Sequence, residues 1–261
     1  MRDSSARPQL SLAIPCYNEQ EVLANTVVHL VDAFAQRQIS LELVLVDNGS
    51  TDGTGRVIDE LIGAGYPVVK QVVPVNRGYG HGVLCGLAAC RGRFVGILHA
   101  DGQVDPHDVV KVYEVAASAK SPTLVKVRRR FRMDGMRRKV ISVAYNLSAN
   151  ILFPRLGSID INGSPKMFPQ EYLARLNLCS ADWFIDPELM IKARRVGLSV
   201  IEFNVLAQMR KGGQSHVDGR TCLEFMVNLL KYRFGRGAAR DARSQSAVAC
   251  PAILDRVNRT A

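Results

Sequence analysis

Short apolar runs alternate with stretches in which apolar residues recur every three or four positions along the first part of the chain. The runs have the length of buried strands, and the recurring positions have the period of an amphipathic helix. Four strands are expected, at Leu10–Pro15, Leu41–Val46, Tyr66–Val73 and Phe94–Leu98. Because strands and helices alternate, we predict an α/β fold with a Rossmann-like, doubly wound, mostly parallel sheet flanked by helices.

The same patterns continue in the second half of the chain. They predict helices at Pro106–Ala119, Pro187–Val196 and Leu223–Tyr232, and strands at Thr123–Val127 and Ser199–Val205. We therefore expect one domain over residues 9–234 that ends in a C-terminal helix. Residues 1–8 are expected to be a flexible N-terminus, and the Arg-, Ala-, Gly- and Ser-rich residues 235–261 a basic, flexible tail.

Polar residues follow the fourth apolar run. His99, Asp101 and Gln103 alternate along the chain, so their side chains can point toward one ion or phosphate. Asp105 and Pro106 are typical of an N-cap and of the first position of a helix. Ligands bind at such strand ends in open α/β sheets. Taken alone, the triplet is also typical of a solvated turn, and that reading stays open here.

Two further turns follow predicted strands. Residues 47–54 read Asp-Asn-Gly-Ser-Thr-Asp-Gly-Thr, a composition typical of a tight turn before a helix that Asp52 or Thr54 can cap. Residues 76–82 carry Gly78, Gly80 and Gly82, whose spacing is not G-x-G-x-x-G and excludes a Rossmann dehydrogenase. These glycines favour either a close approach to a phosphate at a helix N-terminus or a helix entry with unusual φ.

The composition of the chain favours some classes of binding partner over others. The chain has 261 residues, 47% of them hydrophobic, and a formal net charge of +10, which favours nucleotide phosphates, anionic lipid or nucleic acid. Nucleic acid is disfavoured because its usual binding signatures are missing. The six cysteines show no C-x-x-C spacing, which favours reduced thiols in the cytoplasm. The sequence shows neither a signal-peptide pattern nor an apolar run that would span a membrane.

A strongly basic segment begins near residue 126. Eight cations stand there against the single acid Asp134: Lys126, Arg128, Arg129, Arg130, Arg132, Arg137, Arg138 and Lys139. An apolar helical face follows between Val140 and Phe153. Basic residues beside an amphipathic helix can rest on an anionic membrane, and ordinary packing of this helix against the core is the equally weighted alternative.

Several motifs occur together in one order and spacing. They are Pro15-x-Tyr-Asn-Glu19, Asp47-x-Gly-Ser-x-Asp-Gly-Thr54, Asn76-x-Gly-x-Gly-x-Gly82 and Asp101-x-Gln103, followed by Asp160-x-x-Gly-Ser164 and Arg210-x-x-Gly-x-Ser215. In this combination the chain resembles a family-2 glycosyltransferase of GT-A fold. Within that family it is most similar to the dolichyl- or polyprenyl-phosphate hexosyltransferases, over roughly residues 10–219.

The resemblance implies a role for each matching residue. Binding of the nucleotide sugar is implied for Pro15, Tyr17, Asn18, Glu19, Leu45, Asp47, Gly78, His99, Ala100, Asp101, Arg128, Arg210 and His216. Asp101, Gln103 and His99 would hold Mg²⁺ or Mn²⁺, hard ions that suit carboxylate, amide oxygen and diphosphate. An amphipathic acceptor-side helix and its neighbours would supply Arg137, Arg138, Ser142, Ser164 and Ser215. The catalytic residues would be Asp101 and, where a base is needed, Asp182 or Asp186.

Four positions depart from the family pattern. His99 stands where the family usually has an aspartate, and imidazole shifts the preference toward Mn²⁺ or weakens metal binding. Asn48 replaces a second aspartate, Pro165 an aromatic residue, and His216 a lysine.

The resemblance implies an inverting, metal-dependent transfer of a hexose from GDP-mannose or a UDP-hexose to a polyprenyl phosphate. The enzyme would be cytoplasmic and peripheral on the inner face of the cell membrane. An acceptor phosphate is already an anionic nucleophile and requires no general base. One alternative is a soluble hydroxyl acceptor, for which Asp182 or Asp186 would serve as base. Another is a nucleotide-sugar-binding protein without turnover.

Overall fold

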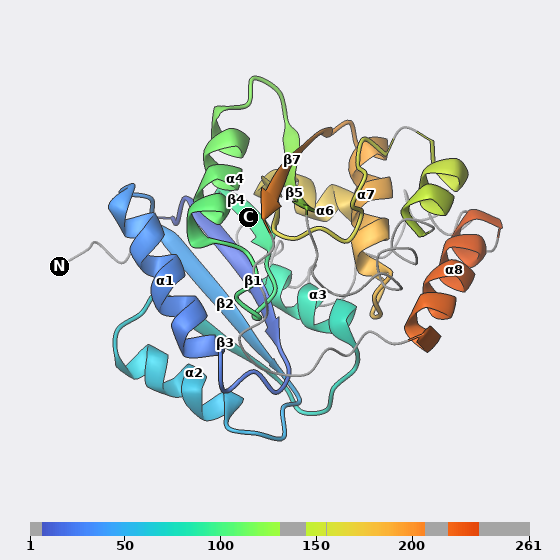
Figure 1. Ribbon diagram of the computed structural model, residues 1–261. Helices are drawn as coiled ribbons and strands as arrows, with labels where there is room; N and C mark the ends of the chain where they lie inside the picture. The colour runs from blue at the N-terminus through green and yellow to red at the C-terminus, as the bar shows by residue number, and fades with distance from the viewer. Residues whose placement is uncertain (1–6, 131–144, 155, 207–218, 235–261) are drawn as a thin grey trace.

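One mixed sheet forms the centre of the molecule in the computed structural model, which describes residues 7–130, 145–154, 156–206 and 219–234 (Figure 1). The described strands are β1 (Leu10–Cys16), β2 (Leu41–Asn48), β3 (Val68–Val73), β4 (Phe94–Ile97), β5 (Thr123–Arg130), β6 (Lys166–Pro169) and β7 (Ser199–Leu206). Their order across the sheet is β3-β2-β1-β4-β6-β5-β7. The first four strands run parallel, which confirms the alternating pattern predicted for this half.

The second half of the sheet differs from the prediction in one strand. β6 lies between β4 and β5 and is antiparallel to both, whereas β5 and β7 are parallel. β6 has four residues, begins with a lysine and ends in a proline. Such a segment has no apolar run that would predict a buried strand. The sheet is therefore mostly parallel, as predicted, with one antiparallel strand that sequence periodicity did not detect.

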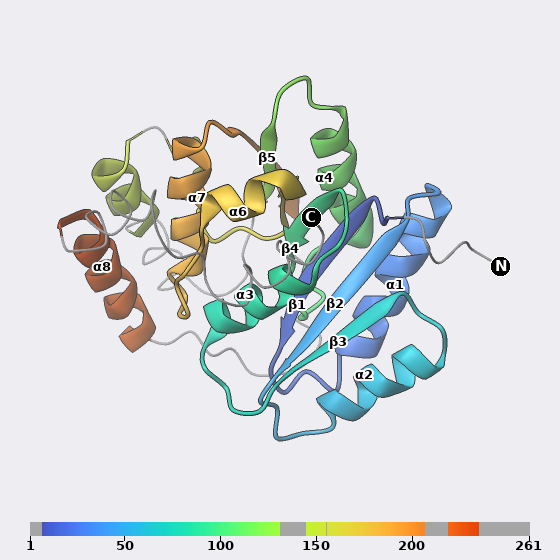
Figure 2. The same ribbon diagram turned by 180° about the vertical axis from the view of Figure 1, so that it is seen from behind.

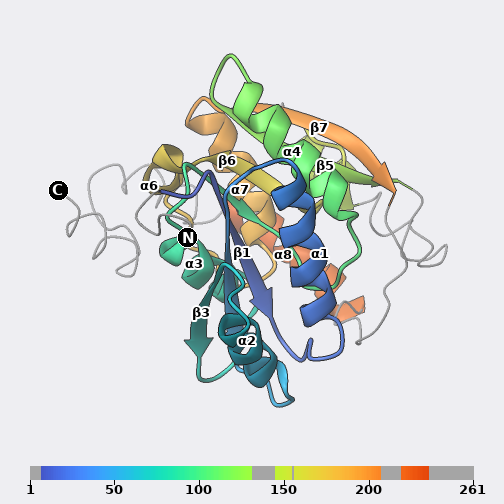
Figure 3. The ribbon, with the colours of Figure 1, turned by 90° about the vertical axis from the view of Figure 1, so that its left-hand side faces the viewer.

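Alternation along the strands divides the core between the two faces of the sheet. Leu12 and Ile14 of β1 belong to a cluster with α1 (Leu23–Gln36), α2 (Thr54–Gly63) and α4 (Pro106–Ser118). Ala13 faces the other way, toward a cluster with α3 (Tyr79–Ala89), α6 (Leu173–Leu176) and α7 (Ile185–Arg195). Figure 3 shows α1 and α4 on one side of β1, with α3 and α6 on the other. Successive strand side chains point to opposite faces, so one strand supplies both cores.

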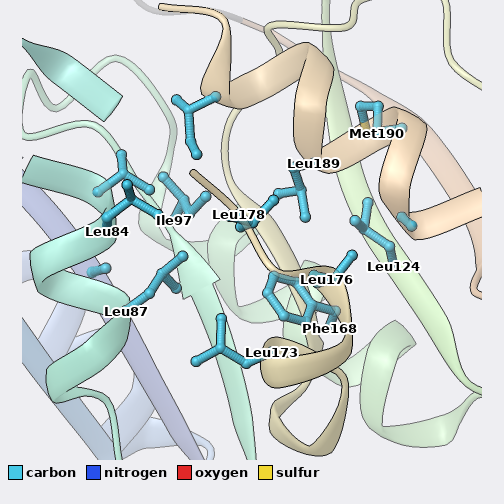
Figure 4. Packing of buried hydrophobic residues seen from close by; sticks show 14 of the residues in the cluster. Leu84, Leu87, Ile97, Leu124, Phe168, Leu173, Leu176, Leu178, Leu189 and Met190 are labelled. Atoms are coloured by element: carbon cyan, nitrogen blue, oxygen red, sulfur yellow. The ribbon is translucent and has the colours of Figure 1, made fainter. Parts of the chain in front are cut away.

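The second of these clusters joins the two halves of the chain. Figure 4 shows its side chains converging from α3, β4, β5, β6, α6 and α7; they include Leu84, Leu87, Ile97, Leu124, Phe168, Leu173 and Leu189. The described helix over residues 145–152 and α8 (Gly219–Phe234) contribute Tyr145, Ala149 and Leu229. The short helices η1 (Gln170–Tyr172) and α6 follow β6 directly.

Local signals set the helix boundaries closely. The Oδ1 atom of Asp105 accepts the N–H of His107 at 2.8 Å, and Pro106 opens α4, which confirms the predicted cap. Gly78 has φ +101° at the start of α3, so this helix entry uses glycine's freedom at positive φ. No helix in the described ranges has the length and apolar character needed to cross a bilayer.

Protein backbone makes the close approach that the glycines at the start of α3 allow. A Cβ atom at Gly78 would lie 2.6 Å from the carbonyl oxygen of Ala181, and one at Gly80 would overlap the carbonyls of Ser180 and Asp182. The N–H of His81 donates to the Ala181 carbonyl at 2.9 Å. The loop before α7 therefore rests on the first turn of α3.

This contact predicts a stability difference between two glycines. Gly80→Ala should lower the free energy of unfolding by about 2 kcal/mol, because the new methyl group meets backbone that has no rotamer to change. Gly63→Ala, at the end of α2 with nothing within 4 Å of the new Cβ, should raise it by about 0.5 kcal/mol. Urea denaturation of both variants measures the difference. Equal stabilities would contradict the contact.

Candidate functional site

The predicted site residues gather at one edge of the sheet. β1 pairs in parallel with β2 on one side and β4 on the other, with Cys16 opposite Asp47 and Ala13 opposite Ile97. The segments that follow these three strands therefore leave the sheet side by side. β5 runs in the same direction as β4, since both are antiparallel to β6, so half-buried Arg128 also lies toward this edge.

Side chains and backbone join the loops after β1 and β2. Thr51 donates its N–H to Oδ1 of Asn18 at 2.8 Å, and Glu19 donates its N–H to Oγ1 of Thr54 at 2.9 Å. The N–H of Gly53 reaches Oε1 of Gln20 at 2.7 Å. Asn18 has φ +56°, a conformation that asparagine tolerates better than most residues. The two loops thus form one rigid unit before any ligand arrives.

Asp47 lies at the end of β2, half-buried under this unit. Its Oδ1 accepts the N–H of Ser50 at 3.0 Å, and its Oδ2 would lie 2.7 Å from a Cβ atom at Gly55, so only glycine leaves this oxygen room. Pro15 and Tyr17 are half-buried on the neighbouring segment. Leu45 is fully buried in the core, and its side chain is a packing element.

Cys16 lies at the base of the same region as an inert thiol. Burial raises its pKa far above the ordinary value, and the carboxylates of Glu19 and Asp47 raise it further. A thiol that stays protonated is a weak nucleophile. The chemistry of this edge therefore rests on oxygen and nitrogen groups.

The segment after β4 forms a tight turn around Asp101. Oδ1 of Asp101 accepts the N–H of Gln103 at 3.1 Å, and Gly102 adopts φ +63°. Ala100 is buried, and its carbonyl shares the hydroxyl proton of Thr26 on α1, at 3.1 Å, with the carbonyl of Val22, at 3.0 Å. A Cβ atom at Gly102 would also lie 3.1 Å from that hydroxyl. Thr26 thus holds the turn that presents Asp101.

His99 points toward α3. Its Nε2 lies 3.0 Å from the hydroxyl of Tyr79, and the two rings meet edge to face with centroids 5.4 Å apart. Tyr79 in turn stacks on Trp183 with a centroid distance of 4.6 Å and an interplanar angle of 16°. The imidazole is thus oriented by an aromatic pair that joins α3 to the loop before α7.

A divalent cation fits this edge if a substrate supplies further ligands. Among the described residues, no three His, Cys, Asp or Glu side chains are grouped to hold a metal ion. Of the predicted ligands, Asp101 is the one carboxylate, and His99 Nε2 lies at Tyr79. Mg²⁺ is commonly held by one or two carboxylates together with substrate phosphates and water. Asp101, in the turn after β4, suits that kind of site.

A second anchored segment, residues 158–164, borders the edge beyond β4. Ser164 is buried, and its hydroxyl donates to the carbonyl of Ile97 at 3.1 Å. Glu202 of β7 accepts from the hydroxyl of Ser158 at 2.6 Å and from the N–H of Ile159 at 2.9 Å. The N–H of Ile161 donates to Oδ1 of Asn146 at 3.0 Å. This segment is therefore fixed to β4, β7 and the helix over residues 145–152.

The two predicted bases have different surroundings. Asp186 is buried and forms an ion pair with the fully buried Lys166 of β6. Asp182 is exposed; its Oδ1 accepts the N–H of Phe184 at 2.9 Å, and its Oδ2 accepts from Asn228 of α8 at 2.8 Å. The first carboxylate thus neutralises the buried Lys166, and the second joins the segment before α7 to the second half of α8.

Three residues of this edge were missed from the sequence. Tyr79 and Trp183 form the aromatic pair beside His99, and Thr26 supports the turn. The sequence did offer a signal for these two: Tyr79 lies within the glycine-rich turn, and Trp183 is the single tryptophan of the chain. Thr26 carries no such signal, because its role exists only once α1 packs beside β4. Predicted residues outside the described ranges are Arg137, Arg138, Ser142, Arg210, Ser215 and His216.

The match to a known family agrees with this geometry. Residues 11–175 match the family described as Glycosyl transferase family 2, which is more than half of the chain. The chain belongs to this family and is a glycosyltransferase of GT-A fold. The predictions of family, fold class and enzyme class are confirmed.

Individual relatives differ in how much of the chain they share. Dolichyl-phosphate beta-glucosyltransferase ALG5A of Trichomonas vaginalis is 25% identical over 251 residues, 90% of this chain and 77% of that protein. Undecaprenyl-phosphate 4-deoxy-4-formamido-L-arabinose transferase of Proteus mirabilis is 31% identical over 140 residues, 53% of this chain and 42% of the relative. The chain therefore spans less than half the length of the second relative.

Solved structures share the fold over most of the chain. Glucosyl-3-phosphoglycerate synthase from Mycobacterium tuberculosis in complex with phosphoglyceric acid has a TM-score of 0.68 and 23% identity, covering 87% of this chain and 81% of that chain. The same enzyme with Mn²⁺, UDP and glucosyl-3-phosphoglycerate has a TM-score of 0.67 and 22% identity, with the same coverage. At this identity, the likeness establishes the architecture.

The buried ion pair of Lys166 and Asp186 leads to a prediction for the stability and activity of a single and a double variant. Lys166→Met alone should destabilise the protein by about 3–5 kcal/mol, because it leaves the Asp186 carboxylate buried and unpaired. The double variant Lys166→Met/Asp186→Leu should recover most of that stability and keep glycosyl transfer, because both charges leave together. Thermal unfolding and transfer assays measure the two effects. A stable but inactive double variant would instead support Asp186 as a base.

Proposed function

We propose that this glycosyltransferase moves a hexose from a nucleoside-diphosphate sugar to a polyprenyl phosphate at the cytoplasmic surface of a membrane, with inversion and with Mg²⁺ or Mn²⁺. The observation that carries the proposal is the convergence of Asp47 and Asp101 at one sheet edge, beside the joined loops after β1 and β2. The relatives named for dolichyl- and undecaprenyl-phosphate support the acceptor class. A GDP-sugar and a UDP-sugar are both candidate donors.

The donor side follows from the rigid unit of the two loops. Pro15, Tyr17 and Glu19 would face the nucleoside, and Asp47 would accept hydrogen bonds from it. Because the loops are joined by their own hydrogen bonds, little ordering is left to occur on binding, which favours affinity.

The metal side rests on Asp101, with Gln103 as a second oxygen ligand. When bound with the donor, the cation neutralises charge on the leaving diphosphate. Complexes of the M. tuberculosis synthase with Mn²⁺ or Mg²⁺ and UDP support this requirement. His99 is oriented by Tyr79 and would border the diphosphate.

The acceptor side favours a phosphate over a hydroxyl. A phosphate oxygen attacks the anomeric carbon as the bond to the donor diphosphate breaks, and no proton has to be removed. Asp186 is engaged by Lys166, and both oxygens of Asp182 accept hydrogen bonds, so both predicted bases have structural partners. Arg128 and Ser164 border the edge from which an acceptor would approach.

The proposal is tested by product analysis. Labelled UDP-glucose and GDP-mannose are each incubated with a short-chain polyprenyl phosphate, with phosphoglyceric acid and with a simple sugar acceptor, with and without Mn²⁺. Transfer to the lipid phosphate that needs the metal and inverts the anomeric centre is the expected outcome. Transfer to a soluble acceptor alone would overturn the acceptor assignment, and binding of a nucleotide without any transfer would indicate a non-catalytic role.

Two substitutions that each remove one negative charge distinguish the proposed metal ligand, Asp101, from another acid of the same loop, Asp105. Asp101→Asn should lower transfer by about 100-fold or more and weaken Mn²⁺ binding in the presence of UDP or GDP. Asp105→Asn removes the same charge four residues away and should change neither, because asparagine caps α4 as well as aspartate does. Calorimetry and initial rates test this pair. Full activity of the Asp101 variant would contradict the metal assignment.

A substitution at Thr26 tests whether its hydroxyl positions the turn that carries Asp101. Thr26→Val keeps the shape of the side chain and removes the hydroxyl whose proton the carbonyls of Ala100 and Val22 share, so the Mn²⁺ affinity measured with nucleotide should fall about tenfold. Thr26→Ser retains the hydroxyl and should keep the affinity. If valine and serine behave alike, the hydroxyl does not position the turn.

A further inference from the structure

The last residue of β2, Asn48, contacts the turn between β3 and α3, which Figure 2 shows beside the loop before α7. Asn48 is 3% exposed. Its Nδ2 donates to the carbonyl of Gly78 at 3.0 Å and to Oδ1 of Asn76 at 3.3 Å. Gly49 follows with φ +72°, and a Cβ atom there would overlap the backbone nitrogen of Asn76. The end of β2 is therefore hydrogen-bonded to residues 76–78 and packs closely against them.

The contacts of the turn fix the orientation of the Asn48 amide. Oδ1 of Asn76 also accepts the N–H of Gly78, at 2.8 Å, so this atom is an acceptor in both contacts. The Gly78 carbonyl can only accept as well. An Asn48 amide turned over would set its oxygen against two oxygens. Among the described residues, Oδ1 of Asn48 has no hydrogen-bond partner, so the protein uses the NH2 half of this side chain.

The turn that Asn48 holds leads into the aromatic group beside His99. Tyr79 follows Gly78, and its hydroxyl lies 3.0 Å from Nε2 of His99. The Tyr79 ring stacks on Trp183, and Gly78 rests on the loop that carries Trp183 into α7. One series of contacts thus leads from the end of β2, across the turn, to His99.

We propose that Asn48 is a positioning residue for the donor diphosphate: its NH2 group holds the turn between β3 and α3, and this turn sets the place of Tyr79 and His99. The inference rests on the proposed function, which puts the diphosphate beside His99. Because the contacts are made by a hydrogen-bond donor, the shape of the side chain does not by itself explain the residue at this position.

An aspartate at position 48 would have the shape of asparagine and none of its amide hydrogens. At pH 8, about four units above the ordinary pKa of an aspartate, a carboxylate would face the Gly78 carbonyl and Oδ1 of Asn76. Turning the Asn76 amide would relieve one of these contacts and set its NH2 against the N–H of Gly78. Asn48→Asp therefore removes both hydrogen bonds while it keeps the volume of the side chain.

The test compares Asn48→Asp with Asn48→Ala and Asn76→Asp in the full chain at pH 8. Asn76→Asp retains the oxygen that both partners use and adds the same charge to the turn, so it is the matched control. Trp183 is the single tryptophan of the chain, and its emission reports on the aromatic group before any ligand is added. Asn48→Asp should shift this emission, and Asn76→Asp should not.

Nucleotide binding and kinetics give the functional readout. With Mn²⁺ present, Asn48→Asp should bind UDP or GDP about tenfold more weakly than Asn76→Asp does, because two acceptors of the turn lose their donor. In transfer assays, the KM of the nucleotide sugar should rise by a similar factor, and the KM of the acceptor should not change. Asn48→Ala, which adds no charge, should be no worse than Asn48→Asp.

Thermal unfolding shows whether each variant is folded at the assay temperature. If Asn48→Asp is not, Asn48→Ala carries the test, and wild-type emission and affinity in that variant would overturn the inference. The inference also fails if Asn48→Asp matches Asn76→Asp, or if it is milder than Asn48→Ala, since the side chain then only fills space. A wild-type protein that binds neither nucleotide would count against the proposed function, whereas the emission of the ligand-free variants would still test the contact with the turn.

Discussion

Two buried lysines on adjacent strands set the constraint on which the second half of the structure depends. Lys126 of β5 and Lys166 of β6 are opposite each other in the ladder, and both side chains are fully buried. Burial, followed by the nearby Lys166, lowers the pKa of Lys126 to about 8, and Glu202 opposes that shift. Buried cations must be paired, so Asp186 brings α7 to the sheet, and Glu202 and the carbonyl of Asp160 fix the segment over residues 158–164.

This arrangement explains why carboxylates near the site have different roles. Asp186 and Glu202 neutralise the core, and Glu188, fully buried on α7, accepts from the N–H of Ser180 at 2.8 Å and pairs with Lys192 at 2.7 Å. Glu188 therefore holds the loop that rests on Gly78 and Gly80. Asp47 and Asp101 lie at the sheet edge, where a ligand can reach them. In the proposed function the acceptor is already anionic and needs no base, which agrees with the structural roles of these buried acids.

Different contacts hold the separate parts of this sheet edge in place. The joined loops after β1 and β2 are rigid by local hydrogen bonds, whereas the turn at Asp101 depends on Thr26 from α1. His99 depends on Tyr79 and, through stacking, on Trp183. Replacement of the family's usual aspartate by His99 therefore comes with an aromatic partner, and in the proposed function the Asp101 carboxylate would meet the metal–diphosphate.

The parallel half of the sheet follows from the sequence alone, because apolar runs, helical periods and turn residues alternate along residues 10–119. The sequence also determined the motifs at Asp47 and Asp101, which follow directly from strand ends, and the cap at Asp105. The antiparallel β6 is known only from the packed fold, because a segment that begins with Lys166 and ends in a proline does not form the apolar run that marks β4. The tertiary structure likewise decided the pairing of Asp186 with Lys166, the backbone contact at Gly80 and the support of Ala100 by Thr26. Each of these joins residues far apart in the chain, and a contact that forms only when separate elements pack leaves no periodicity in either partner.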